Sequence, residues 1–211
     1  RLGELKEEQL KTFESTLSLL KQTIRSRQLT SREESGLLYV IAEYAHTWVL
    51  LQKYDKDELA LPEKAHVPTY ALDYPFAKEA IALLKKELMS KNEASELFGC
   101  ERGEGLEGIL HGIYQTFGGE ELYKSIEEKA AHLLYFVIKD HPFADGNKRI
   151  GSLLFIIFLS RNKYLLRKNG ESKINDNALV AIALLIAESK PGQKDVMIKL
   201  VMNFLEPVTS Q

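Results

Sequence analysis

Two apolar stretches with helical spacing flank one short polar loop, and this arrangement constrains the fold more than any other feature of the sequence. Before the loop, apolar residues recur at helical intervals between positions 120 and 139, which predicts an amphipathic helix. His141 stands before Pro142, so helical geometry is disfavoured there and the helix is expected to end near Asp140. After the loop, a helix is predicted from residue 147 to about 163, and its middle, residues 150–159, is apolar on nearly every side, which is typical of a buried central helix. The core therefore anchors the loop at both ends.

Helical spacing also runs through most of the remaining chain, which predicts an all-α fold. Residues 55–74 lose this spacing and contain two prolines, so they are expected to form a connection. Residues 99–120 are rich in glycine and fit either a short helix or a β-hairpin, because periodicity alone does not separate the two. Further helices are predicted over residues 4–28, 31–54, 75–89, 92–98, 176–188 and 194–205.

The composition argues against several classes of function. The formal net charge of the 211-residue chain is -2, whereas a dedicated nucleic-acid binder usually carries a basic excess, so no nucleic-acid partner is expected. The longest apolar runs, at 153–159 and 178–187, are shorter than the roughly 20 residues that cross a bilayer, so no membrane span is expected either. Cys100 is the single cysteine, which excludes a disulfide within the chain and favours a reducing, cytoplasmic setting.

The polar loop carries residues suited to phosphate chemistry. The start of the following helix offers free N–H groups and a partial positive charge, both of which attract anions. Gly146 would let backbone amides approach a ligand closely, and Lys148 and Arg149 add two cationic donors beside it. Asp145 is suited to a Mg²⁺ ion that bridges phosphate oxygens. His141 is the side chain in the loop that can take up a proton near neutral pH.

Each of these residues, taken alone, also has a purely structural explanation. His141 could cap the preceding helix, and Asp145 and Asn147 could cap the following one. Lys148 and Arg149 could simply be solvated. A histidine–aspartate metal pair of another kind is conceivable, although no third ligand stands out. The chemical interpretation is favoured because all of these polar and glycine positions lie together between two apolar helices.

Residues 141–149 read His-Pro-Phe-Ala-Asp-Gly-Asn-Lys-Arg, which resembles the signature of the Fic/Doc (Fido) family, His-Pro-Phe-x-Asp/Glu-Gly-Asn-Gly/Lys-Arg. The helical segment 126–135 is also similar to the helix before this loop in Doc-like members. The glycine-rich residues 105–110 stand where the family keeps a flap. The resemblance is specific over about 104–160, and nothing specific is recognised in residues 1–60.

The resemblance implies an all-α bundle with a small β-hairpin flap. A Fic/Doc (Fido) domain would occupy residues 70–205, with its motif loop at 141–149 and its flap at about 101–119, after an N-terminal helical extension over residues 1–60. The flap would dock a segment of the target protein as an added strand, a mode that uses main-chain hydrogen bonds. The flap residues implied for this docking are Leu106, Gly108, Ile109 and Leu110.

The same resemblance implies a role for the residues of the loop. His141 would act as general base toward a hydroxyl group of the target, and Phe143 would point into the core and fix the loop. Asp145 would hold Mg²⁺, and the donor would be ATP or another nucleotide. The phosphates of this nucleotide would be held by Gly146, Asn147, Lys148 and Arg149. Catalysis would rest mainly on positioning and charge neutralisation.

Two positions bear on which group the resemblance implies is transferred. Fic members that transfer AMP usually have glycine where this chain has Lys148, whereas the Doc-like branch has lysine and is associated with phosphoryl transfer. Doc-like motifs often have alanine where this chain has Gly146. The motif is therefore intermediate. Phosphoryl transfer is favoured because of Lys148, and AMP transfer (AMPylation) is the alternative.

The residue at position 152, a serine, bears on whether the protein is catalytically active and on how it is regulated. Many Fic members carry a second arginine at this place, which binds the γ-phosphate and pairs with an inhibitory glutamate. Its absence here motivates a further alternative, a catalytically silent module that binds nucleotide or peptide. The nearest match to the inhibitory segment is residues 30–35, where a capping box between Ser31 and Glu34 is a sufficient explanation without regulation.

Partners other than the target segment are also open. A separate antitoxin-like inhibitor would fit a toxin-like member of the family. The helices at 4–28 and 31–54 could pack on the core or on a second subunit, so a homo-oligomer is a further alternative.

Overall fold

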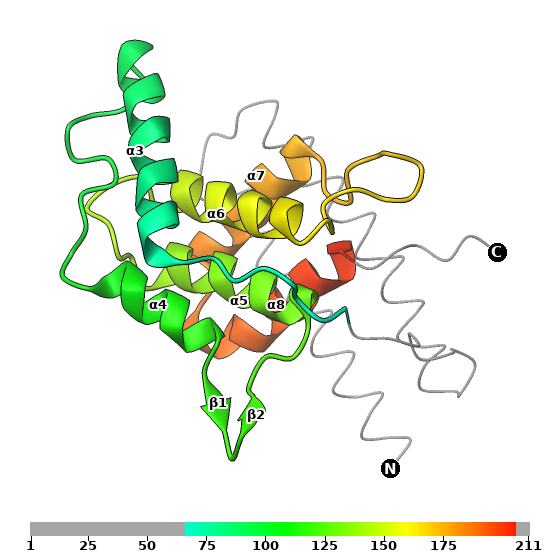
Figure 1. The fold of residues 1–211 in the computed structure, drawn as a ribbon. Helices are drawn as coiled ribbons and strands as arrows, with labels where there is room; N and C mark the ends of the chain where they lie inside the picture. The colour runs from blue at the N-terminus through cyan, green and yellow to red at the C-terminus, as the bar shows by residue number, and fades with distance from the viewer. Residues whose placement is uncertain (1–65, 206–211) are drawn as a thin grey trace. The chain divides into compact units, whose positions relative to one another are not determined.

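The computed structural model describes residues 66–205 (Figure 1). These residues fall into two compact units, His66–Ser172 and a second unit to which residues 173–205 belong. The predicted helices at 4–28 and 31–54, the extension over 1–60 and Glu34 lie outside the described residues. Within residues 66–205, the regular elements are helices and one two-stranded hairpin, which confirms the predicted all-α class with a small β-hairpin.

Helices α5 (Ile126–Lys139) and α6 (Asn147–Arg161) pack against each other in the first unit (Figure 1). Gly151 of α6 lies where an added Cβ would come within 3.1 Å of the Ile138 side chain, so the glycine lets the two helices approach closely. The buried residues of α6 confirm the prediction of a buried central helix. They are Ile150, Gly151, Leu154, Phe155, Phe158 and Leu159.

Helix α5 begins at Ile126 rather than at the predicted position 120. The Ser125 hydroxyl accepts a hydrogen bond from the Glu128 N–H at 3.1 Å, and the Glu128 carboxylate accepts one from the Ser125 N–H at 3.1 Å. This capping box satisfies two N–H groups at the helix start and fixes where the helix begins. Glu120 and Glu121, which were predicted to begin the helix, belong to the hairpin instead.

Helix α3 (Tyr74–Ser90) begins close to its predicted start, with the Asp73 carboxylate accepting a hydrogen bond from the Phe76 N–H at 2.9 Å. The short helix predicted over residues 92–98 is absent. Asn92 adopts a φ of 57° and donates its N–H to the last turn of α3 at 3.0 Å, which closes that helix. The chain then continues toward the polar loop as an irregular segment.

The glycine-rich stretch contains a helix, α4 (Gly105–Ile113), so the predicted position of the flap is wrong. Its apolar residues recur at helical spacing and point into the core, which is the helical alternative that periodicity left open. These residues are Leu106, Ile109, Leu110 and Ile113, exposed by 0%, 9%, 3% and 0%. Strand docking through Leu106, Gly108, Ile109 and Leu110 is thereby contradicted, because their backbone is helical and the three apolar side chains are buried.

The hairpin follows α4 and consists of β1 (Thr116–Phe117) and β2 (Glu120–Glu121), which pair antiparallel. Gly118 and Gly119 form its turn with φ values of 61° and 85°, which glycine adopts without a steric cost. The hairpin projects beyond the ends of α4 and α5 (Figure 1). The paired positions are Thr116 with Glu121 and Phe117 with Glu120.

A fully buried lysine, Lys129 of α5, fixes the base of the hairpin. Its ammonium group donates to the Ile113 carbonyl at 3.4 Å and to the Tyr123 carbonyl, and it lies 3.1 Å from the Glu121 carboxylate. These acceptors come from the end of α4, from β2 and from the connection to α5. A buried ammonium group requires such partners, so Lys129 ties the hairpin to both neighbouring helices.

The segment before α3 is attached to the ends of α5 and α6. The His66 carbonyl accepts a hydrogen bond from the Ile126 N–H at 2.8 Å. The Asn162 side chain accepts hydrogen bonds from the backbone N–H groups of residues 69 and 70 at 2.9 and 3.0 Å. Its amide also donates to the Tyr70 carbonyl at 3.2 Å. The central helix pair is therefore closed off at the ends that lie away from the polar loop.

In the second unit, α7 (Asp176–Glu188) and α8 (Lys194–Leu205) coincide with the predicted helices. The Asn175 side chain caps α7 by accepting a hydrogen bond from the Ala178 N–H at 2.8 Å. A short 3-10 turn, Pro191–Gln193, joins the two helices. None of the helices within residues 66–205 combines the length and the apolar character needed to cross a membrane.

Replacing Lys129 with methionine is expected to lower the free energy of unfolding by about 2–4 kcal/mol, because the carbonyls of Ile113 and Tyr123 lose their buried donor. Lys124→Met is the matched control, since Lys124 is 64% exposed and pairs with Glu120 at the surface. Such exposed pairs contribute about 0–1 kcal/mol. Urea unfolding curves of the three proteins measure the difference, and equal losses in both variants would contradict this role for Lys129.

Candidate active site

The motif loop at 141–149 is held in place by the segment 99–102, which lies beside it. Three backbone hydrogen bonds join the two segments, so the loop is paired almost as a strand would be. Beneath it lies the ring of Phe98, which is 0% exposed. The three bonds run from the Gly99 N–H to the Asp145 carbonyl at 3.1 Å, from the Ala144 N–H to the Cys100 carbonyl at 2.8 Å, and from the Arg102 N–H to the Pro142 carbonyl at 2.8 Å.

The side chain of Asn147 holds the loop from within. Its Oδ1 accepts a hydrogen bond from the Phe143 N–H at 3.0 Å, and its Nδ2 donates to the Phe143 carbonyl at 2.9 Å. The Phe143 side chain itself lies in the core and is 1% exposed. Both polar atoms of the Asn147 side chain are therefore bound to the loop. The backbone N–H of Asn147, in the first turn of α6, is then the group of this residue that could reach a phosphate.

Gly146 precedes α6 in a conformation that only glycine adopts easily, with a φ of 90°. A Cβ added here would lie 2.4 Å from a ring carbon of Phe98, a distance at which atoms clash. No side chain caps α6. Because the first N–H groups of a helix have no partner within the helix and carry partial positive charge, this end of α6 is suited to an anion.

Two charged side chains of the loop, Asp145 and Arg149, lie next to each other. The Asp145 Oδ1 accepts a hydrogen bond from the Gly146 N–H at 2.7 Å, and its Oδ2 lies 3.8 Å from Nη2 of Arg149. Arg149 also donates to the Glu93 carbonyl at 2.8 Å and lies 4.6 Å above the Phe98 ring. The guanidinium of Arg149 therefore has partners in the protein, while the Asp145 side chain, 46% exposed, is accessible to a cation.

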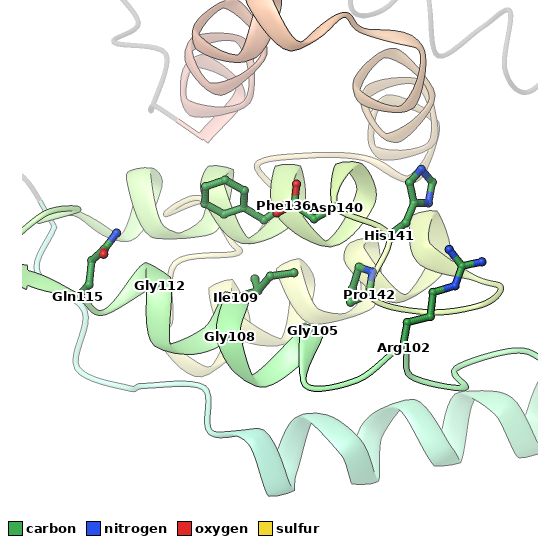
Figure 2. A pocket seen from close by; sticks show the side chains of 10 residues that line it. All are labelled: Arg102, Gly105, Gly108, Ile109, Gly112, Gln115, Phe136, Asp140, His141 and Pro142. Carbon is green, nitrogen blue, oxygen red and sulfur yellow. The ribbon is translucent and has the colours of Figure 1, made fainter.

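His141 follows α5 at an unusual point of the backbone. Its φ is 51°, in the left-handed region that few residues other than glycine adopt. Such outliers cluster at functional sites. The buried Pro142 follows it, whereas His141 is exposed. Both residues line a cavity of about 490 Å³ (Figure 2), which is within the size range of small-molecule sites.

Much of one wall of this cavity is bare helix backbone, because three of the four α4 residues that line it are glycines. At two of these glycines an added Cβ would meet no atom within 4 Å, so packing does not require glycine at either. Glycine in a helix costs about 1 kcal/mol of stability relative to alanine. These glycines therefore lower the stability of α4 while they leave this wall of the cavity open. Figure 2 shows Arg102 and His141 at one end of the cavity and Gln115 at the other. The glycines that line it are Gly105, Gly108 and Gly112.

Comparison with family models gives a match for most of the first unit. Residues 75–159 match the model of the Fic/DOC family. This segment belongs to the Fic/DOC family. The matched residues of the Fic/DOC domain run from α3 into α6 and include the hairpin and the motif loop. The domain is of the enzyme type that transfers nucleotide-derived groups to proteins. No curated protein and no solved structure matched the chain.

The Fic/DOC domain brings some of the predicted site residues to the cavity and leaves others outside it. Of the predicted loop residues, His141 lines the cavity. Gly108 and Ile109, predicted to dock a target strand, line it as parts of a helix. The predicted metal and phosphate residues, 145–149, are not among the cavity-lining residues and lie around the start of α6.

Asp145 is the residue of the Fic/DOC domain that could hold Mg²⁺. Within residues 66–205, no group of three or more histidine, cysteine, aspartate or glutamate side chains is arranged to hold a metal ion. Mg²⁺ in nucleotide sites usually takes one or two carboxylates and completes its coordination with water and phosphate oxygens. One accessible carboxylate beside an uncapped helix start therefore fits an ion that binds together with a nucleotide.

Sequence reasoning missed Phe98 and Arg102, which contact or border the site from a segment distant in the chain. No local pattern pairs residues 98–102 with the motif loop, because these contacts are tertiary. The spacing of glycines at 105, 108 and 112 is the signal that could have predicted an open helix face.

Gly146→Ala is expected to lower the free energy of unfolding by about 2–4 kcal/mol, because the new methyl group meets the Phe98 ring and the backbone is strained for alanine. Gly112→Ala is the matched control: its Cβ would meet open space, so a change between zero and a gain of about 1 kcal/mol is expected. Denaturant unfolding measures both. If Gly146→Ala were as stable as the wild type, the clash would not govern this position.

Proposed function

We propose that this Fic/DOC domain transfers the terminal phosphate of ATP to a hydroxyl group of a target protein. One observation carries the proposal: an exposed imidazole, that of His141, stands on the same backbone-fixed loop as the uncapped start of α6. The imidazole is suited to accept a proton, and the helix start is suited to bind phosphate. A rigid loop keeps the two at a constant separation, which is what catalysis by positioning requires.

The proposed reaction needs only groups that this site and its substrates contain. His141 accepts the proton of the target hydroxyl group as its oxygen forms a bond to the γ-phosphorus of ATP. The bond between this phosphorus and the bridging oxygen to the β-phosphate breaks, and ADP leaves. The helix start and Lys148 neutralise charge on the phosphates. A Mg²⁺ ion bound at Asp145 would supply further positive charge to the phosphate oxygens.

Transfer of phosphate rather than AMP is favoured by Lys148. Its ammonium group, on the second residue of α6, is expected to occupy space that a glycine would leave to phosphate, and it changes where the positive charge of the site lies. The neighbouring Gly146 does not argue for AMP transfer, because its φ and the Phe98 ring already require glycine there. Lys148 is therefore the motif residue that bears on the donor orientation.

Incubation of the protein with Mg²⁺-ATP and a cell-lysate fraction is expected to add one phosphate group to a target, as read by intact-mass spectrometry. His141→Ala should abolish this gain, because the target hydroxyl loses its base. The matched control is His111→Ala, since His111 is an exposed residue of α4 that does not line the cavity. Modification that persists in His141→Ala would contradict the proposed base. A gain of AMP would instead support AMP transfer, and nucleotide binding without any gain would support a silent binding module.

Lys148→Gln is expected to reduce the rate of phosphate transfer at least tenfold, because a neutral side chain no longer stabilises the phosphate charge. Lys86→Gln, at an exposed position of α3, is the matched control for loss of one positive charge. The rates come from time courses of target modification. An unchanged rate in Lys148→Gln would remove the basis for phosphoryl transfer, and a switch of product from phosphate to AMP in Lys148→Gly would show that this residue sets the donor orientation.

A further inference from the structure

The cavity beside His141 is lined by a cation that the motif loop does not supply, Arg102. Arg102 belongs to the segment before α4, and its backbone N–H donates to the Pro142 carbonyl at 2.8 Å. This bond fixes its backbone next to the residue that follows His141. Its side chain is exposed, and Figure 2 shows it at the same end of the cavity as the imidazole.

The Arg102 guanidinium differs from that of Arg149, the arginine of the motif, because no residue in the described part of the chain binds it. Within residues 66–205, its guanidinium makes no hydrogen bond and no ion pair with the protein. Arg149, in contrast, donates to the Glu93 carbonyl and lies over the Phe98 ring. The five donors of Arg102 are therefore available, and their planar arrangement matches two oxygens of one phosphate group.

The surroundings of Arg102 leave room for such a group. Gly105 and Pro142, which line the cavity near it, bring neither charge nor a long side chain. Asp140 is the carboxylate among the cavity-lining residues, and it comes from the end of α5, whereas Arg102 comes from the opposite side of the cavity (Figure 2). The Arg102 guanidinium and the Asp140 carboxylate thus belong to different segments of the cavity lining.

We infer that Arg102 binds the phosphoryl group that faces His141, as a second phosphate-binding cation from outside the motif loop. The inference rests on the proposed function, in which this group is the γ-phosphate of ATP. When the target oxygen attacks, the oxygens of the transferred group carry negative charge that a positioned guanidinium stabilises. Arg102 then acts from the cavity, while the start of α6 acts on the rest of the phosphate chain.

Nucleotide titration of the full chain tests this role, with ATP, ADP and AMP as probes in the presence of Mg²⁺. Arg102→Gln is expected to weaken ATP binding at least tenfold and to leave ADP binding unchanged, because ADP lacks the γ-phosphate. Arg102→Lys keeps the charge without the planar donors and is expected to show an intermediate loss. Arg167→Gln, at a position that does not line the cavity, is the matched control and should bind all three nucleotides like the wild type.

The outcomes separate this inference from the proposed function. If Arg102→Gln binds ATP as the wild type does while transfer still depends on His141, the role of Arg102 is wrong and the proposed function stands. If Arg102→Gln loses affinity for ATP, ADP and AMP alike, Arg102 binds phosphate but the α-phosphate faces His141, which contradicts phosphoryl transfer. A wild-type protein that binds none of the three nucleotides would overturn both.

Discussion

A loop that joins two buried helices needs hydrogen-bond partners for its own backbone, because buried polar groups without partners destabilise the folded state. The Fic/DOC domain meets this requirement from two directions. From within, the Asn147 amide binds both polar groups of the Phe143 backbone. From outside, residues 99–102 pair with residues 142–145. The position of His141 and the start of α6 both depend on these bonds, so the site is built by backbone pairing more than by side-chain contacts.

The sequence predicts those elements of the fold that local contacts determine. Helices α3 and α7 begin where Asp73 and Asn175 cap them, and a cap can be read within a few residues of chain. The predicted flap lies too early in the chain because the glycines at 105, 108 and 112 resemble loop residues, although the apolar residues between them keep helical spacing. The adjacent glycines at 118 and 119 were the local signal for the hairpin turn.

The sequence predicts which residues make up the candidate site, but it does not predict which group each side chain contacts. The loop residues are contiguous, so their chemistry could be read directly from the sequence. Asn147 and Arg149 were both expected to bind phosphate, yet their side chains bind the backbone of Phe143 and Glu93. These contacts depend on how the chain turns back on itself, and no spacing rule encodes them. The same holds for Arg102, whose place beside the loop follows from a tertiary hydrogen bond.

The contact between Phe98 and Gly146 makes two distant positions of the chain depend on each other. An aromatic ring at position 98 leaves no room for any side chain at position 146. A smaller residue at 98 would open space for the alanine that Doc-like motifs often carry, at the cost of some backbone strain. Among related domains, these two positions are therefore expected to covary. The glycine of the motif would then reflect the size of a core residue. A classification of family members by this glycine would group them by the packing beneath the loop and not by the chemical group that they transfer.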